Sequence, residues 1–212
     1  MLFRDRPDAG CRLATRLTDF AGPDTVVLGL PRGGVPVALE VARTLDAPLD
    51  VVLVRKLGSP RNSEYAIGAI GAGGVRVVDR EAMRALGVTD HELELIEARE
   101  RVELERRTTR FRGDRAALEL AGKTAIVVDD GIATGSTARA ACLIVREMGA
   151  SRIVLAVPVA PRDPIARIDD AADEFVCLET PAHFFAVGKW YSDFTQTTDE
   201  EVAAALAAWR VS

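Results

Sequence analysis

Apolar and polar positions follow two different periods along the first quarter of the chain. Residues 26–30 form a short apolar run that is typical of a buried strand. Residues 35–45 repeat apolar side chains every three or four positions, as one face of a helix does. A second β-branched run at 51–54 completes a strand–helix–strand unit. Because such units join parallel strands, this quarter of the chain predicts an α/β fold.

The same alternation returns in the second half. The predicted strands are 125–128, 153–159 and 175–178. The predicted helices are 136–148, a short one opened by Asp163-Pro164, and a final one that begins with a capping pair at Thr198 and Glu201. Strands and helices in alternation build a mainly parallel central sheet with helices on both faces.

The middle of the chain departs from this alternation. A polar loop at 57–64 is followed by runs at 66–70 and 75–78 that predict a hairpin, because a glycine-rich turn joins them. Residues 79–115 are helical in pattern, densely charged and poor in apolar positions, so we expect them to stand off the main sheet. Their glutamates are interleaved with arginines, which favours a solvated face or a subunit contact, such as a homodimer, over nucleic-acid binding.

Composition limits the function classes. The chain has 212 residues, of which 48% are hydrophobic and 28% charged, enough for one α/β domain with a sizeable core. No apolar run reaches the ~18 residues that a membrane span needs, and residues 1–20 lack the apolar core of a signal peptide. The net charge of −5 argues against nucleic acid as the main partner. We therefore expect a cytoplasmic protein without a membrane or nucleic-acid partner.

Residues 127–137 contain the pattern with the clearest chemistry. A buried strand ends in Asp129 and Asp130, and a glycine-bounded loop rich in hydroxyls then opens a helix. Backbone N–H groups at the beginning of a helix bind anions, and small residues let a phosphate approach closely. The adjacent carboxylates can accept hydrogen bonds from a vicinal diol. A phosphate next to a diol indicates a phosphorylated sugar.

Other interpretations of this loop fit less well. A Walker A loop needs a lysine before its Ser or Thr, whereas Gly135 is followed directly by Ser136. The G-x-S-x-G sequence of a nucleophile elbow is absent. An ordinary strand-to-helix turn with acidic flanking residues is the remaining structural alternative.

Three other polar clusters follow predicted strands. They are Arg32-Gly33-Gly34, Arg55-Lys56 and the turn at 158–161. Ligands of open parallel sheets bind beyond the carboxyl ends of the strands. We therefore expect these clusters to meet Asp129 and Asp130 at one rim of the sheet.

Residues 126–138 resemble the signature of the type I phosphoribosyltransferases that binds 5-phosphoribosyl 1-pyrophosphate (PRPP): hydrophobic residues, two acids and a small-residue loop. More widely, the chain resembles stand-alone bacterial phosphoribosyltransferase-domain proteins of undefined acceptor, through residues 30–34, 54–58 and 190–194. The resemblance implies a single domain over 1–212, with hood elements from about 57–78 and 180–197 and a helical insertion at about 79–115.

This resemblance also implies an activity. It is the Mg²⁺-dependent transfer of the phosphoribosyl group from PRPP to a nitrogenous base or amine, with release of pyrophosphate. The alternative is a PRPP-binding regulator without turnover. One half of a PRPP synthetase is disfavoured, because that family needs a second such domain and an ATP site. The 6-oxopurine enzymes carry Asp where this chain has Ala133, which argues against hypoxanthine or guanine as acceptor.

The resemblance assigns roles residue by residue. The catalytic candidates are Asp129, Asp130, Lys56 and Arg32. Asp129 and Asp130 would hold the ribose hydroxyls and bind Mg²⁺ directly or through water, with Asp193 as a further metal candidate. The 5′-phosphate loop comprises Gly131, Ala133, Thr134, Gly135, Ser136 and Thr137. The pyrophosphate group comprises Arg32, Gly33, Arg55 and Lys56, with a strained peptide bond implied in the Arg32-Gly33 loop.

The acceptor side is less defined. Its candidates are Glu64, Tyr65, Phe185, Trp190 and Tyr191. A flat base stacks well on an aromatic ring, which is why Phe185 is included. For residues 190–194, a hydrophobic patch under the final helix is an equal alternative. Residues 57–65 resemble the loop that covers the site and excludes water.

Overall fold

The computed structural model describes residues 2–62, 65–113, 115–162 and 171–209. Its strands are β1 (Thr25–Gly29), β2 (Leu49–Val51), β3 (Val54–Gly58), β4 (Ala66–Gly71), β5 (Arg76–Val78), β6 (Thr124–Val128), β7 (Arg152–Val159) and β8 (Glu174–Glu179). Its α-helices are α1 (Arg6–Ala14), α2 (Gly34–Leu45), α3 (Arg80–Leu86), α4 (Asp90–Arg112), α5 (Ser136–Glu147) and α7 (Asp199–Ala208). Short 3₁₀ helices are η1 (Thr18–Phe20), η2 (Ala72–Gly74) and η3 (Val187–Trp190).

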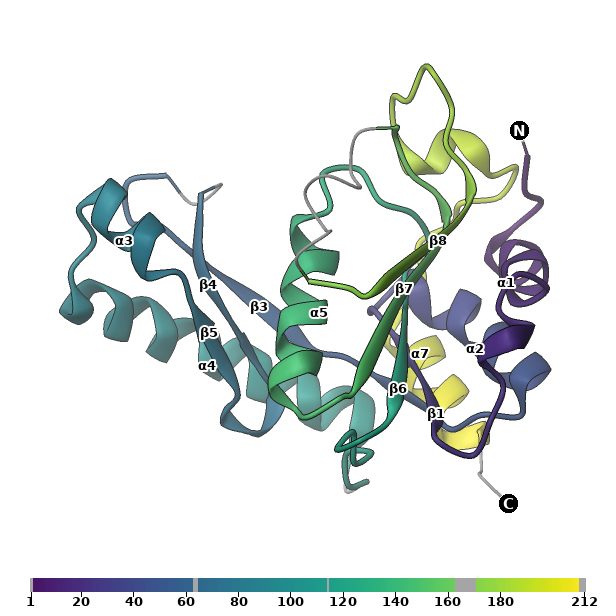
Figure 1. Cartoon of the computed structure of the whole chain (residues 1–212), viewed down its shortest axis with the longest axis horizontal. Coiled ribbons are helices and arrows are strands. Elements are labelled where there is room, and N and C mark those ends of the chain that lie inside the picture. Colours follow the sequence, from purple (N-terminus) through teal and green to yellow (C-terminus); the bar gives the residue numbers. More distant parts are fainter. Residues whose placement is uncertain (1, 63–64, 114, 163–170, 210–212) are drawn as a thin grey trace.

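A five-stranded parallel sheet in the order β2-β1-β6-β7-β8 forms the centre of the molecule. Helices α1, α2 and α7 cover one face and α5 covers the other (Figure 1). Alternate residues of each inner strand face the two layers: Val27 packs toward α2, and Val26 and Leu28 pack toward α5. Burial on both faces explains the nearly continuous apolar runs in these strands. The predicted α/β class is confirmed.

A second, antiparallel sheet of β3, β4 and β5 stands beside the first and forms the hood. The predicted hairpin is confirmed as β4–η2–β5. The predicted strand at 51–54 is wrong, because β2 ends at Val51 and β3 begins at Val54 in the other sheet. Strand β3 also extends through Gly58, into the predicted polar loop. The buried residues Val52 and Leu53 connect the two sheets, so hydrophobicity alone did not mark the change.

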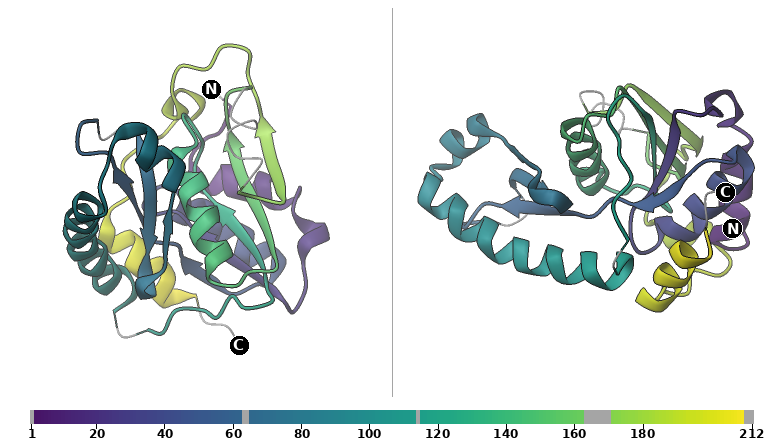
Figure 2. Two further views of the ribbon diagram at one scale, coloured as in Figure 1. Left: turned by 60° about the vertical axis from the view of Figure 1, so that its left-hand side comes forward. Right: turned by 90° about the horizontal axis from the view of Figure 1, so that it is seen from below.

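Helix α4 is the long element of the charged insertion. It begins at a capping box between Thr89 and Glu92, and its glutamates pair with arginines one turn further on. Figure 2 shows α4 extending from beneath the small sheet toward α7, and it contacts both β3 and α7. At its C-terminal end, the buried Arg112 guanidinium lies 3.0 Å from a carboxylate oxygen of Asp50. This pair fixes the end of α4 to the edge strand β2.

The predicted helix 136–148 and the capping box at Thr198 and Glu201 are confirmed in α5 and α7. The short helix expected at Asp163-Pro164 lies outside the described residues. Within the part of the chain that the structure describes, no helix combines the length and the apolar character that crossing a bilayer requires.

Candidate active site

The loop after β6 changes direction at two glycines. Gly131 has a φ of 155°, and a side chain there would meet Val187 at 2.6 Å. Gly135 has a φ of 77° and precedes the first turn of α5. No side chain caps the α5 N-terminus, whose first turn contains no acid. The amides of this turn therefore have no partner within their own helix and can receive an anion.

Hydroxyl groups surround the same turn. Thr134 Oγ1 and Ser136 Oγ lie 3.2 Å apart, and Ala133, Thr134 and Thr137 are exposed. Small exposed residues leave the approach to the helix N-terminus open. Such a loop suits a phosphate, which needs donors on several sides.

The two acids lie at the carboxyl end of β6. The Asp130 side chain is 14% exposed, and its backbone N–H donates to Asp129 Oδ1 at 2.9 Å. Burial, followed by the neighbouring charge of Asp130, raises the pKa of Asp129 well above its usual range. Burial also raises the pKa of Asp130, although Arg6 opposes that rise. A bound cation or hydroxyl donor would favour the ionised forms of both carboxylates.

Arg6 contacts the acid pair of the candidate site and is not among the residues predicted from the sequence. Its Nε donates to Asp130 Oδ2 at 2.8 Å, and its Nη1 donates to the carbonyl oxygen of Thr195 at 2.7 Å. Its guanidinium also lies 4.0 Å from the ring centroid of Phe194. The side chain comes from the first turn of α1, 124 positions before Asp130. No local pattern distinguishes it from the other arginines near the N-terminus.

The glycine loop after β1 packs directly on the two acids. A Cβ at Gly33 would lie 2.0 Å from Asp130 Oδ2, and one at Gly34 would lie 2.8 Å from Asp129 Cα. The peptide bond between Pro31 and Arg32 in this loop is cis. The Ile132 amide also donates to Val159 O at 2.9 Å, which joins the end of β7 to the same rim. The structure thus brings together the glycine loop after β1, the two acids after β6 and the turn that follows β7.

Lys56 and Arg55 diverge from one another, as neighbours on a strand do. Lys56 Nζ lies 3.3 Å from Ser136 Oγ, so it reaches the loop predicted to bind the 5′-phosphate, because β3 packs against α5. It does so from a hood strand and not from the end of a parallel strand, which corrects the expected position. Arg55 instead forms an ion pair of 2.5 Å with Glu100 of α4. Arg32 is likewise engaged, 3.5 Å from Asp199 of α7.

The acceptor candidates are scattered over the surface and the core. Tyr65 and Phe185 are 60% and 87% exposed, whereas Trp190 is partly buried. Tyr191 is 1% exposed, and its hydroxyl donates to the backbone oxygen of Asp130 at 2.6 Å. It therefore packs under the loop in this structure, and its contact with an acceptor stays a prediction. Glu64 lies outside the described residues, as does part of the expected cover loop.

A magnesium site must be assembled from few protein ligands. Among the described residues, no group of three or more acidic, histidine or cysteine side chains is placed to hold a metal. Asp193 is exposed and accepts hydrogen bonds from the amide and hydroxyl of Thr195, which lower its pKa. Asp129 and Asp130 are two adjacent carboxylates. This donor set fits Mg²⁺, which is commonly held by one or two carboxylates together with substrate oxygens and water.

The parallel sheet, the antiparallel hood and the two acids before a small-residue loop together define the phosphoribosyltransferase class. The family model of the phosphoribosyl transferase domain matches residues 12–193, and the chain belongs to this family. A Mycobacterium tuberculosis protein named "Putative phosphoribosyl transferase Rv0571c" is 55% identical over 205 residues, which are 97% of this chain and 46% of that protein. The chain thus spans about half the length of the curated relatives it matches.

Solved structures agree on the fold. The crystal structure of TT1426 from Thermus thermophilus is 47% identical in sequence, covers 99% of both chains and superposes with a TM-score of 0.91. A Neisseria gonorrhoeae protein with bound ppGpp has a TM-score of 0.51 at 13% identity, with 99% of both chains covered. At that identity the likeness concerns the fold alone.

Proposed function

We propose that this chain transfers the phosphoribosyl group of PRPP to a nitrogenous base or amine, with Mg²⁺, and releases pyrophosphate. The observation that carries the proposal is one arrangement at the rim of the sheet. Two largely buried acids follow β6, the small-residue loop leads into the N-terminus of α5, which no side chain caps, and Lys56 reaches Ser136 in that turn. Family membership supports the same class of reaction.

Each part of the rim has a task in this proposal. The amides and hydroxyls of residues 133–137 receive the 5′-phosphate. Asp129 and Asp130 accept hydrogen bonds from the ribose hydroxyls, while Arg6 keeps the Asp130 carboxylate oriented at 2.8 Å. Gly33 and Gly34 let the pyrophosphate loop approach without a side chain between loop and acids. These contacts hold the sugar while the bond at its anomeric carbon breaks.

Charge develops in two places during that step. The sugar acquires oxocarbenium character, as in glycoside hydrolysis, and the leaving pyrophosphate gains negative charge. Lys56 and Arg32 stabilise the second charge, and they cost no reorganisation if they are already in place. Mg²⁺, when bound, supplies further positive charge to the pyrophosphate oxygens.

A coupled assay tests the proposal. The chain is incubated with PRPP, Mg²⁺ and a panel of bases and amines, and the release of pyrophosphate is measured. Asp130→Asn should abolish most of the release, whereas Asp46→Asn should leave it unchanged. Asp46 is a suitable control because it is exposed at the end of α2 in a left-handed conformation that Asn tolerates. Tight PRPP binding without release for any acceptor would instead favour a regulator without turnover.

A further inference from the structure

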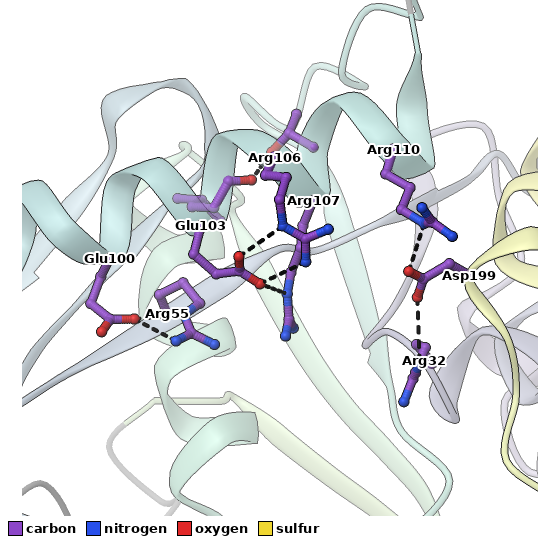
Figure 3. A network of polar contacts seen from close by, with 10 residues as sticks. Arg32, Arg55, Glu100, Glu103, Arg106, Arg107, Arg110 and Asp199 are labelled. Carbon is purple, nitrogen blue, oxygen red and sulfur yellow. Dashed lines mark hydrogen bonds and ion pairs between the residues drawn. The ribbon is translucent and has the colours of Figure 1, made fainter.

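Arg32, the arginine of the pyrophosphate loop, is held by an acid from the far end of the chain. Its Nη1 lies 3.5 Å from Asp199 Oδ1, and the Arg32 side chain remains 40% exposed (Figure 3). Asp199 occupies the first position of α7, 167 positions later. One oxygen at this distance engages one edge of the guanidinium. The other donors of the fork stay available for a ligand.

Asp199 is itself fixed from the opposite side. Its second oxygen, Oδ2, lies 2.6 Å from Arg110 Nε, and Arg110 Nη2 lies 2.5 Å from Glu200 Oε1. Arg110 belongs to the last turns of α4, whose end is anchored by the buried Arg112–Asp50 pair. The Asp199 carboxylate thus bridges an arginine of α4 and an arginine of the glycine loop. The contact with Arg110 of α4 is the shorter of the two, at 2.6 Å against 3.5 Å for Arg32.

The backbone of this turn does not depend on the Asp199 side chain. Thr198 Oγ1 accepts from the Glu201 amide at 3.1 Å, and Glu201 Oε2 accepts from the Thr198 amide at 2.7 Å. This reciprocal capping box pairs the amides of Thr198 and Glu201 without using the Asp199 carboxylate. Side-chain capping of α7 thus uses Thr198 and Glu201, whereas the Asp199 carboxylate contacts two arginines.

We propose that Asp199 is a positioning residue, which holds the Arg32 guanidinium at the rim so that it meets the pyrophosphate of PRPP without reorganising. The inference rests on the proposed function, in which Arg32 binds pyrophosphate. An arginine on a glycine loop has many rotamers, and fixing them before binding removes an entropic cost from the binding step. Through Arg110, the same carboxylate makes the rim depend on the insertion helix α4.

Asp199→Asn and Glu200→Gln provide a matched comparison. Both remove one negative charge from the first turn of α7, and both remove a partner of Arg110. Only the first removes a contact with Arg32. Asp199→Asn should weaken PRPP binding about 3- to 5-fold, the scale of one partly exposed ion pair, while Glu200→Gln should leave the dissociation constant within a factor of about 1.5.

A double-mutant cycle with Arg32→Gln separates positioning from a structural role. In the Arg32→Gln background, Asp199→Asn should have no further effect on PRPP affinity, and Asp199→Glu in the native background should restore part of the loss. Equal affinities for Asp199→Asn and Glu200→Gln would overturn the inference. So would an Asp199→Asn effect that persists without Arg32. Failure of the wild-type chain to bind PRPP would refute the proposed function itself. This outcome is distinct from the others, because it is measured without any Asp199 substitution.

Discussion

Replacement of Arg6 by Met tests whether the acid pair depends on a distant arginine. The Arg6 and Asp130 side chains are 10% and 14% exposed, and their charged atoms are 2.8 Å apart. Met approximates the apolar stem of Arg but lacks the guanidinium. Asp130 then keeps its burial and its neighbour Asp129, and loses the group that opposes the rise of its pKa. The folded state must hold an uncompensated carboxylate or take up a proton.

The size of the effect follows from this burial. Breaking a buried pair by removing one partner costs about 3–5 kcal/mol, and the residual exposure of both side chains places this pair at about 3 kcal/mol. For a chain of this size, 1 kcal/mol shifts the melting temperature by about 2–4 °C, so we expect Arg6→Met to lower it by ~6–12 °C. Arg12→Met is the control in the same helix. Arg12 pairs with Asp8 on the surface at 48% exposure, so its replacement should cost ~1 kcal/mol or less.

The pH dependence identifies the cause. A carboxyl whose pKa is raised in the folded state binds more protons there than in the unfolded chain, so its contribution to stability falls as pH rises through that window. Losing Arg6 raises the folded pKa of Asp130 further. In thermal denaturation, Arg6→Met should therefore lose more stability relative to the wild type at pH 7 than at pH 5. Adding Asp130→Asn to Arg6→Met should remove most of this loss. A deficit equal to that of Arg12→Met, or one independent of pH, would refute the reasoning.

Three further outcomes are expected. In a thermal shift assay, PRPP at ~100 times its dissociation constant, with Mg²⁺, should stabilise the chain by roughly 2.7 kcal/mol. Asp130→Asn should lose most of this stabilisation, and equal shifts for the variant and the wild type would contradict a role of Asp130 in ribose binding. Lys56→Ala should keep PRPP binding but lower the rate of pyrophosphate release ~10²-fold, whereas a change in affinity alone would argue against transition-state stabilisation. Burial raises the pKa of Cys142 to about 12, so a thiol reagent at pH 8 should label the exposed Cys11 and spare Cys142, and mass spectrometry of the native protein would detect any exception.

The parallel sheet was predictable because its signal is local. Each inner strand is buried on both faces and each helix shows one apolar face, so periodicity separates them. The exchange between sheets at residues 51–54 was not predictable in the same way. Val51 to Val54 is an unbroken apolar run, and the chain leaves one sheet and enters the other without a glycine or proline. Pattern alone does not say which sheet a buried valine joins.

The candidate site likewise contains a part that was predictable from local sequence and a part that was not. Residues 129–137 are contiguous, so their chemistry is visible in one reading of the sequence. Lys56 was found among the candidates, although the structure places it on a hood strand. Arg6 and Asp199 were missed because each meets its partner across more than a hundred residues. Tertiary pairing of this kind leaves no periodicity or motif at either position.

The close approach of Gly33 to the acid pair has a consequence for mutational tolerance. Its φ is −62°, an ordinary value for any residue, so the backbone alone would accept alanine. The obstacle is that a methyl group would fall 2.0 Å from Asp130 Oδ2 and displace the carboxylate. Gly22, with nothing within 4 Å of its missing Cβ, is the opposite case. In a saturation library selected for function, position 33 should therefore be almost invariant, whereas position 22 should accept many residues. Steric exclusion at the rim would then be observed directly, as the absence of substitutions at position 33.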